Sequence, residues 1–479
     1  MNDTSDIPHG LLRLEVDLAR DLERLNHPPA DWTPHREGPD GRAMADVAIV
    51  GGGMCGLAAA FALRRLGISN IAHVDRRAEG LEGPWLTYAR MQTLRSPKHL
   101  TGPAMGLPNL TFRAWYEAQG FDWQRLDRIT RADWMGYLRW YRRVTGARIA
   151  NGQAVSHIAP AHDHVELTVD GQTIHARRLV LATGREGQAV PRIPEPLAPF
   201  FGGLVRHSSD EVDFAALRDK RVVVIGLAAS AFDNAATALD AGAREVVLLG
   251  RAPAMPRLNK MKQTVYPGFT HGFADLPDSD KLALLEHVTS FRIAPPRGSV
   301  LRIAGDPRAR VVMGTEVTGA TAAGGGLRLS TTTGELASDL VILGTGFAID
   351  VTAPPEMAGF SGRILRWADR VADAQGEWGS FPYLGAGFEF LPREGQAEEG
   401  LGRIHCFTHT AQLSLGNLAN DIPAVSEGAE RLARAIAASL FVEDRAYHRQ
   451  RLMDYAEPEL LGDEWSEVSA WSPAAPAGG

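Results

Sequence analysis

Three glycines and one acid near the start of the chain have the types and spacing needed to bind a pyrophosphate. They are Gly51, Gly53, Gly56 and Asp75. Gly51 permits a tight turn, Gly53 lets the backbone approach the phosphates, and Gly56 lets a helix pack closely on a strand. Asp75 comes roughly 20 residues later, where a carboxylate accepts the hydroxyl groups of a ribose. The pattern predicts a dinucleotide site.

A second group of residues repeats this pattern with alanine in place of two glycines. The residues are Gly226, Ala228, Ser230 and Ala231. Their side chains are small enough to keep the close packing that the turn requires. Arg251 stands where the first pattern has Asp75. A guanidinium binds a 2′-phosphate, which a carboxylate would repel, so we predict FAD at the first site and NADPH at the second.

Both patterns lie in segments that read as strand, glycine turn, helix and strand. The first runs from Ala45 to Asp75, with a helix that ends at Gly67. The second runs from Arg221 to Leu249, with a helix that ends at Gly242. The sequence therefore predicts an α/β fold with two Rossmann-like dinucleotide-binding domains.

Two further apolar strands end in small residues and indicate where the chain passes between the domains. The strand at 178–182 leads into Thr183 and Gly184, and the strand at 340–343 leads into Gly344, Thr345 and Gly346. The first ending resembles the crossover in flavoproteins with two dinucleotide domains. We predict an FAD domain made of residues 45–205 and 341–465, with an NADPH domain, residues 206–340, inserted into it. Residues 1–44 are expected to form a helix and linker, and residues 466–479 a flexible tail.

Composition excludes several classes of protein. A chain of 479 residues is too long for one ordinary core, and a formal charge of −7 without a basic run argues against nucleic-acid binding. Cys55 and Cys406 make neither a disulfide framework nor a zinc site, so no metal is expected. We find no signal peptide and no run long enough to cross a membrane. We expect a cytoplasmic protein without a membrane partner, and homo-oligomerisation stays open.

Polar side chains are concentrated just after the first dinucleotide pattern, on the side of such a fold where ligands collect. They are Arg90, Gln92, Arg95, Lys98 and His99, and Trp85 precedes them. This group could orient a ring system or a polar substrate. Each of the charged residues is equally compatible with a solvated loop.

The segment between the two patterns carries a more specific motif. Phe201-x-Gly203-x-x-x-His207 resembles the fingerprint of class B flavin-dependent monooxygenases. The resemblance implies that NADPH reduces FAD, that O2 forms a flavin C4a-(hydro)peroxide, and that one oxygen atom enters a small polar substrate. It also implies that His207 organises the cofactors. Glu211 stands where Baeyer-Villiger enzymes commonly have Trp or Pro, which makes that activity less expected.

Two short matches favour the N-hydroxylating branch of that family. Met91-Gln92 resembles the pair whose glutamine lies by the flavin, and His207-Ser208-Ser209 resembles a second motif of these enzymes. Lys98 is the counterpart of a lysine that holds the substrate carboxylate, although its spacing is longer by one residue. The resemblance thus implies Gln92, Lys98 and His207 as catalytic residues, with Trp85 and Gln92 near the flavin.

The C-terminal part is expected to complete the FAD site. Asn420-Asp421 precedes a helical stretch at 424–440, where flavoproteins of this type often have Gly-Asp. Asp421 would contact the ribityl chain, or it would simply cap the helix.

These features lead to a monooxygenase that most resembles an amine or amino-acid N-hydroxylase. The alternatives are hydroxylation of a purine-like ring such as urate, Baeyer-Villiger or sulfur oxidation, and a non-enzymatic flavoprotein redox sensor. A disulfide reductase would need a pair of redox cysteines that this chain lacks.

Overall fold

The computed structural model describes residues 9–291, 293–419, 421–461 and 464. Its larger sheet has the strand order β3-β2-β1-β6-β5-β4, with β17 also paired to β6. β1, β2, β6 and β17 run parallel, while β4 and β5 form an antiparallel extension. The strands are β1 (Ala45–Val50), β2 (Ile71–Asp75), β3 (Ala150–Asn151), β4 (Val155–Pro160), β5 (Val165–Val169), β6 (Gln172–Leu181) and β17 (Ile404–Cys406).

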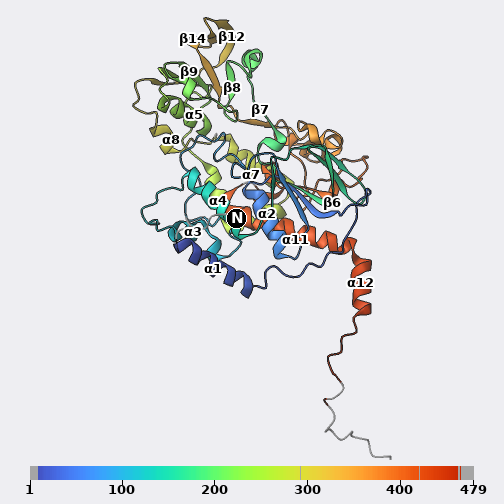
Figure 1. Ribbon diagram of the computed structural model, residues 1–479. Helices are drawn as coiled ribbons and strands as arrows, with labels where there is room; N and C mark the ends of the chain where they lie inside the picture. The colour runs from blue at the N-terminus through green and yellow to red at the C-terminus, as the bar shows by residue number, and fades with distance from the viewer. Residues whose placement is uncertain (1–8, 292, 420, 462–463, 465–479) are drawn as a thin grey trace, which may run out of the picture.

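Helices from both ends of the chain complete this first domain. α2 (Met54–Arg65) is buried along most of its length and packs against α11 (Val425–Glu443), as the adjoining ribbons in Figure 1 show. α1 (His9–Arg24) buries three leucines at helical spacing and lies against α3 (Phe112–Ala118), which in turn contacts α4 (Arg131–Val144). The predicted N-terminal helix is therefore present, and residues from near both ends of the described chain share one core.

The second sheet has five parallel strands in the order β11-β10-β9-β15-β8. They are β8 (Val205–His207), β9 (Arg221–Ile225), β10 (Glu245–Gly250), β11 (Ala309–Met313) and β15 (Leu340–Leu343). α5 (Ala229–Asp240) packs on β9 and β10, and α8 (Arg297–Leu301) packs on α5. α6 (Pro267–Gly272) and α7 (Asp278–Ser290) precede α8. This domain occupies the upper left of Figure 1.

Smaller elements extend and join the two sheets. An antiparallel meander of β12 (Val317–Ala323), β13 (Gly326–Thr331) and β14 (Gly334–Ser338) forms the tip of the second domain. β7 (Ala189–Pro191) pairs with β16 (Phe347–Ile349), so the outgoing and returning segments form a two-stranded connection. Three short helices lie near the C-terminus: α9 (Trp367–Arg370), α10 (Gln412–Leu415) and α12 (Arg445–Asp454).

The predicted division into domains runs close to these elements. Strands of the second sheet cross the predicted boundaries by a few residues, because β8 begins at Val205 and β15 ends at Leu343. The predicted tail at 466–479 lies outside the described residues. Within the described part of the chain, no helix is long and apolar enough to cross a bilayer.

Candidate functional site

The first glycine turn is shaped by close packing at two of its three glycines. Gly51 has a φ of +109°, and a β-carbon there would lie 2.4 Å from the carbonyl oxygen of Ala182. A β-carbon at Gly56 would lie 1.8 Å from the carbonyl oxygen of Gly51. At Gly53 the nearest atom would be 3.8 Å away, in Gly83. The turn and the helix thus need Gly51 and Gly56, whereas Gly53 leaves open space before the helix.

The N-terminus of the helix that follows this turn can bind an anion. Gly53 is the N-cap of α2, no side chain caps the helix, and its first turn contains no acid. The N–H groups of that turn therefore have no side-chain acceptor and face the space at Gly53. Asp75 is buried at the end of β2, where its Oδ2 accepts the Gly52 N–H at 2.6 Å and its Oδ1 accepts the Arg77 N–H at 2.7 Å. Each oxygen keeps a lone pair for a ribose hydroxyl, so the residues fit the predicted FAD.

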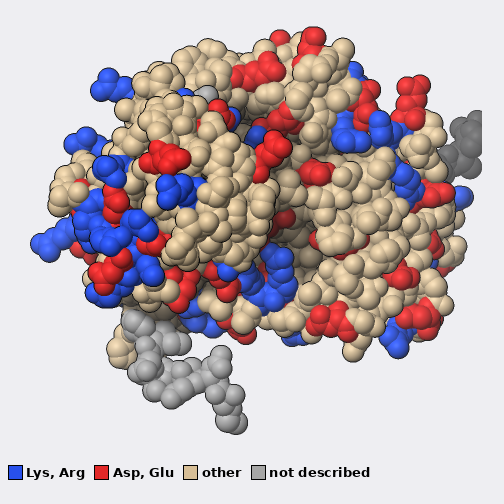
Figure 2. All heavy atoms as spheres, turned by 90° about the horizontal axis from the view of Figure 1, so that it is seen from above, with Lys and Arg blue, Asp and Glu red and all other residues tan. Residues whose placement is uncertain are grey.

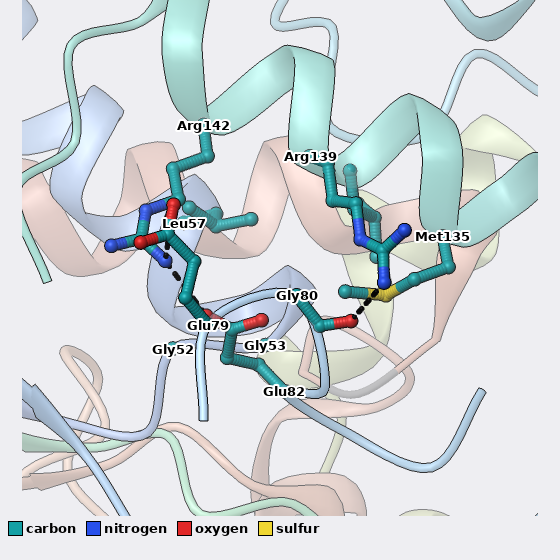
Figure 3. A pocket seen from close by; sticks show the side chains of 10 residues that line it. Gly52, Gly53, Leu57, Glu79, Gly80, Glu82, Met135, Arg139 and Arg142 are labelled. Atoms are coloured by element: carbon teal, nitrogen blue, oxygen red, sulfur yellow. Dashed lines mark hydrogen bonds and ion pairs between the residues drawn. The ribbon is translucent and has the colours of Figure 1, made fainter. Parts of the chain in front are cut away.

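A small cavity of about 30 Å³ lies beside this turn and is shown in Figure 3. Gly52 and Gly53 form one wall, and the loop that carries Glu82 forms another. Arg142 of α4 binds Glu82 at 2.8 Å, and Arg139 donates to the carbonyl oxygen of Gly80 at 2.7 Å. These bonds hold the loop after β2 against α4, beside the place where the nucleotide would lie.

His73 of β2 contacts this turn, and the sequence patterns did not indicate that role. Its Nε2 lies 2.9 Å from the carbonyl oxygen of Gly51, and burial lowers its pKa to about 4. The ring is therefore neutral at pH 7, and Nε2–H donates to Gly51. The only signal in the sequence is a histidine inside the apolar strand before Asp75.

Replacing His73 with leucine should weaken FAD binding by about tenfold, because a buried hydrogen bond to the turn is lost. Titration of the apoprotein with FAD, followed by flavin fluorescence, measures the change. His405 is a matched control, because it is also buried, also has a pKa lowered to about 4 by burial, and contacts the Gly387 carbonyl oxygen at 2.7 Å. His405→Leu should lower stability and leave FAD affinity within about threefold. Equal losses of FAD affinity in the two variants would contradict this prediction.

The second turn has the same close packing as the first, but the methyl group lies on the helix instead of on the neighbouring strand. Gly226 has a φ of +128°, and a β-carbon there would lie 2.5 Å from the carbonyl oxygen of Gly344. Ala231 occupies the place of the third glycine, and a β-carbon at Gly344 would lie 2.7 Å from its methyl group. In the first domain the corresponding strand-end residue is Ala182, and the helix carries Gly56. The alanine in the second helix is thus accommodated by a glycine in the neighbouring strand.

This turn also fits a nucleotide. Ala228 is the N-cap of α5, with no side-chain cap and no acid in the first turn, and Ser230 lies in that turn. Arg251 follows β10, and its side chain is 74% exposed with Glu316 at 3.6 Å. A guanidinium that is so exposed and so loosely paired is available to a 2′-phosphate.

His207 lies at the junction of the two domains and is fully buried. Its Nδ1 lies 2.7 Å from the Ser209 hydroxyl and its Nε2 lies 3.1 Å from the carbonyl oxygen of Gly346. Burial lowers its pKa, so the ring is neutral at pH 7. Its backbone N–H donates to Asp210 at 2.8 Å. With all these atoms engaged, His207 holds the end of β8 to the returning segment. Its predicted role in organising the cofactors agrees with this position and stays a prediction.

A cleft of about 860 Å³ separates parts of the two domains. Gln92 and Arg95 lie on its first-domain wall, and Asp233 of α5 lies on the opposite wall. Other residues that line it include Met91, Arg125, Arg128, Arg297, Ser299 and Arg302. Seen from above in Figure 2, the surface is hollowed near its centre, and acidic and basic side chains border the hollow. The cleft is large enough for a ring-shaped substrate beside a cofactor.

Known proteins that resemble this chain identify its family. The chain matches the family described as pyridine nucleotide-disulphide oxidoreductase over residues 48–303. It is also 36% identical over 469 residues to an FAD-dependent urate hydroxylase of Xanthomonas campestris pv. campestris, with 96% of this chain and 98% of the relative covered. The chain belongs to this family, and the second match places it among the flavin-dependent monooxygenases.

Solved structures share the fold of this monooxygenase. The ornithine N-hydroxylase of Kutzneria sp. 744 is 18% identical with a TM-score of 0.65, covering 83% of this chain and 99% of that one. The L-lysine 6-monooxygenase of Pseudomonas syringae is 19% identical with a TM-score of 0.65, covering 82% and 99%. The predictions of the two-domain α/β fold, of an enzyme, and of FAD and a pyridine nucleotide as cofactors are confirmed, and the preference for NADPH stays a prediction.

This monooxygenase differs from the disulphide oxidoreductases for which its family is named. Its two cysteines, Cys55 and Cys406, are both buried and form no disulfide. Cys406 Sγ instead donates to the side-chain oxygen of Gln188 at 3.1 Å, and burial raises the pKa of its thiol. A buried thiol of raised pKa is a poor nucleophile, so neither geometry nor acidity supports cysteine redox chemistry here.

Lys98 does not line the cleft. Its Nζ donates to the carbonyl oxygens of Trp123 at 2.7 Å and Leu126 at 2.6 Å, and it lies 5.0 Å from the centre of the Trp123 ring. In this position the ammonium supports the loop that forms one wall of the cleft. Binding of a substrate carboxylate by Lys98 stays a prediction.

The remaining residues predicted to contact FAD lie in the loop after β2, at the two crossovers and before α11. Burial raises the pKa of Asp421 to about 6, against the opposing effects of the Ile422 N–H and Arg185. Trp85 accepts a hydrogen bond from Arg131 at 2.8 Å through its carbonyl oxygen. Thr183, Gly184 and Gly346 lie at the two crossovers, and both glycines have positive φ. Their contacts with FAD stay predictions.

Proposed function

We propose that this monooxygenase hydroxylates a purine-like ring, with urate as the first substrate to test. The observation that carries this proposal is the end-to-end match, at 36% identity, to an FAD-dependent urate hydroxylase. The match includes both nucleotide turns and the segments that line the cleft, so it bears on the substrate as well as on the cofactors. A cytoplasmic location belongs to the same proposal.

In the overall reaction, NADPH, a proton, O2 and the ring give NADP⁺, water and the hydroxylated ring. Bound FAD supplies the redox chemistry, because it accepts two electrons from NADPH and passes them on to O2. The chain's own residues bind and orient the cofactors and the substrate. The first turn of α2 and Asp75 would hold the FAD pyrophosphate and ribose, and Arg251 would hold the 2′-phosphate of NADPH. Gln92 would face the substrate, and closure of the cleft would exclude water.

N-hydroxylation of an amine or amino acid is the second candidate. It is favoured by Gln92, which lies on the wall of the cleft as the resemblance to N-hydroxylases implies. Two of the three N–H groups of Lys98 are already bonded to carbonyl oxygens, which weakens the case for an amino-acid carboxylate at that position. For this reason we place ring hydroxylation first.

A substrate panel tests the proposal. The purified enzyme with FAD is mixed with NADPH, O2 and, one at a time, urate, ornithine, lysine, cadaverine, a thioether and a cyclic ketone. We expect urate to accelerate NADPH oxidation and to be converted in a ratio of about one to one, with little hydrogen peroxide. A hydroxylamine formed from an amine while urate stays inert would support the second candidate and reject the first.

A further inference from the structure

Among the arginines of the cleft, Arg95, Arg128 and Arg297 form no ion pair with the described residues, and Arg95 is the one that lies beside Gln92. Arg125 forms an ion pair with Asp122 at 3.3 Å, and Arg302 binds Asp240 at 2.6 Å. The guanidinium of Arg95 makes no hydrogen bond and no ion pair within 4 Å with the residues that the structure describes. Surrounding protein lowers its pKa by desolvation. Arg95 keeps exposed surface in the cleft, so an anionic ligand can reach the guanidinium and supply the acceptor that it lacks.

The charges around Arg95 come from both domains. Asp233 of α5 interacts favourably with it, and Arg185 of the first domain interacts unfavourably. Asp233 is itself buried, and burial raises the pKa of its carboxyl group. The carboxylate is too far away to form an ion pair with Arg95, so the guanidinium stays available on the side of the open cleft.

Gln92 supplies a second unsatisfied group on the same wall. It lies three residues before Arg95, it is exposed to the cleft, and its side chain bonds to none of the described residues. Its amide offers two N–H donors and one carbonyl acceptor. A planar anion with adjacent acceptor atoms and ring N–H groups matches this combination, because the guanidinium can bind two acceptors at once.

We propose that Arg95 and Gln92 form the recognition site for the charged edge of the substrate, and that the cleft binds its substrate as a planar heterocyclic anion. This inference rests on the proposed function and names the residues that give it specificity. Arg95 supplies the charge and two parallel N–H donors. Gln92 forms hydrogen bonds with the neighbouring donor and acceptor of the ring, next to the place predicted for the flavin.

The test compares Arg95→Gln with Arg297→Gln, which removes an equal charge from an equally unpaired residue on the opposite wall of the cleft. We expect Arg95→Gln to raise the KM for urate by about 10- to 100-fold, because charge-assisted hydrogen bonds are lost. Arg297→Gln should change it by less than about threefold, because only long-range attraction is reduced. FAD content of the purified variants shows whether both have folded. Equal effects in the two variants would overturn the assignment to Arg95.

A second measurement separates charge recognition from loss of shape. Binding of urate and of hypoxanthine, which is neutral at pH 7, is followed by the change that each causes in the flavin absorbance of the oxidised holoenzyme. Arg95→Gln should weaken the binding of urate by about 10- to 100-fold and the binding of hypoxanthine by less than about threefold. Arg95→Lys should recover part of the urate affinity, because it restores the charge without the planar pair of donors. Equal weakening of the two purines would reject anion recognition.

The two proposals fail in different ways. If wild-type protein binds urate through Arg95 without hydroxylating it, the proposed function is wrong and the anion site stands. If wild-type protein hydroxylates urate and Arg95→Gln does so with the same KM, the function stands and the anion site is wrong. If neither urate nor benzoate, as a second planar anion, perturbs the flavin in an Arg95-dependent way, the anion site is rejected.

Discussion

Replacing Gly56 with alanine should leave a protein that binds FAD at least about 100-fold more weakly than wild type. The new β-carbon would lie 1.8 Å from the carbonyl oxygen of Gly51 and 3.0 Å from Nε2 of His73. The first obstacle is backbone, which cannot rotate away as a side chain can. The glycine turn or α2 must therefore move, and the N–H groups that face the pyrophosphate move with it.

Gly53→Ala is the matched control for this effect. A β-carbon at Gly53 has no neighbour nearer than 3.8 Å, so the protein should fold with the turn intact. FAD would still bind more weakly, because the methyl group would occupy the space through which the pyrophosphate passes. We expect the melting temperature of the FAD-free protein to fall for Gly56→Ala and to stay near wild type for Gly53→Ala. Equal destabilisation would show that the two glycines have the same structural role.

Replacing Arg251 with alanine should lower kcat/KM for NADPH by about 10- to 100-fold, because a charge-assisted contact with the 2′-phosphate is lost. The same change should leave kcat/KM for NADH within about threefold, since NADH has no 2′-phosphate. The side chain is 74% exposed and its partner Glu316 is 3.6 Å away, so its loss should hardly affect folding.

Steady-state oxidation of the two nucleotides measures this ratio. Arg310→Ala is a suitable control, because Arg310 is exposed on the neighbouring strand β11 and pairs with Glu245. Arg310→Ala should change kcat/KM for NADPH and for NADH only slightly, and by the same factor. If Arg251→Ala lowers the efficiencies for NADPH and NADH by the same factor, the assignment of Arg251 to the 2′-phosphate is wrong.

Much of the fold follows from short-range patterns in the sequence. The two glycine turns, the helices behind them and the strands on either side extend over about 30 residues each, and each is determined by local conformation and hydrophobic periodicity. Because β2 and β10 end where their turns require, the positions of Asp75 and Arg251 could be predicted as well. The inserted arrangement of the domains followed from the order of these local patterns.

Other features depend on residues that only the folded chain brings together. Ala231 is accommodated by Gly344, more than a hundred residues later in the chain, and no local pattern indicates that pairing. From the sequence, Lys98 was predicted to bind a substrate carboxylate. In the folded chain, two carbonyl oxygens lie beside its ammonium group and accept its hydrogen bonds. A polar side chain bonds to whatever acceptor the tertiary structure brings near it, which spacing alone does not reveal.

By itself, the sequence of this monooxygenase determined which segments form dinucleotide turns and what charge stands at the end of each second strand, because both depend on local backbone geometry. The tertiary structure decided which polar side chains are satisfied and which are left facing the cleft. Arg95 and Asp233 come from different domains, and their relation depends on how the two sheets pack. Contacts between domains arise from the complementarity of whole surfaces, and a linear motif does not record that complementarity.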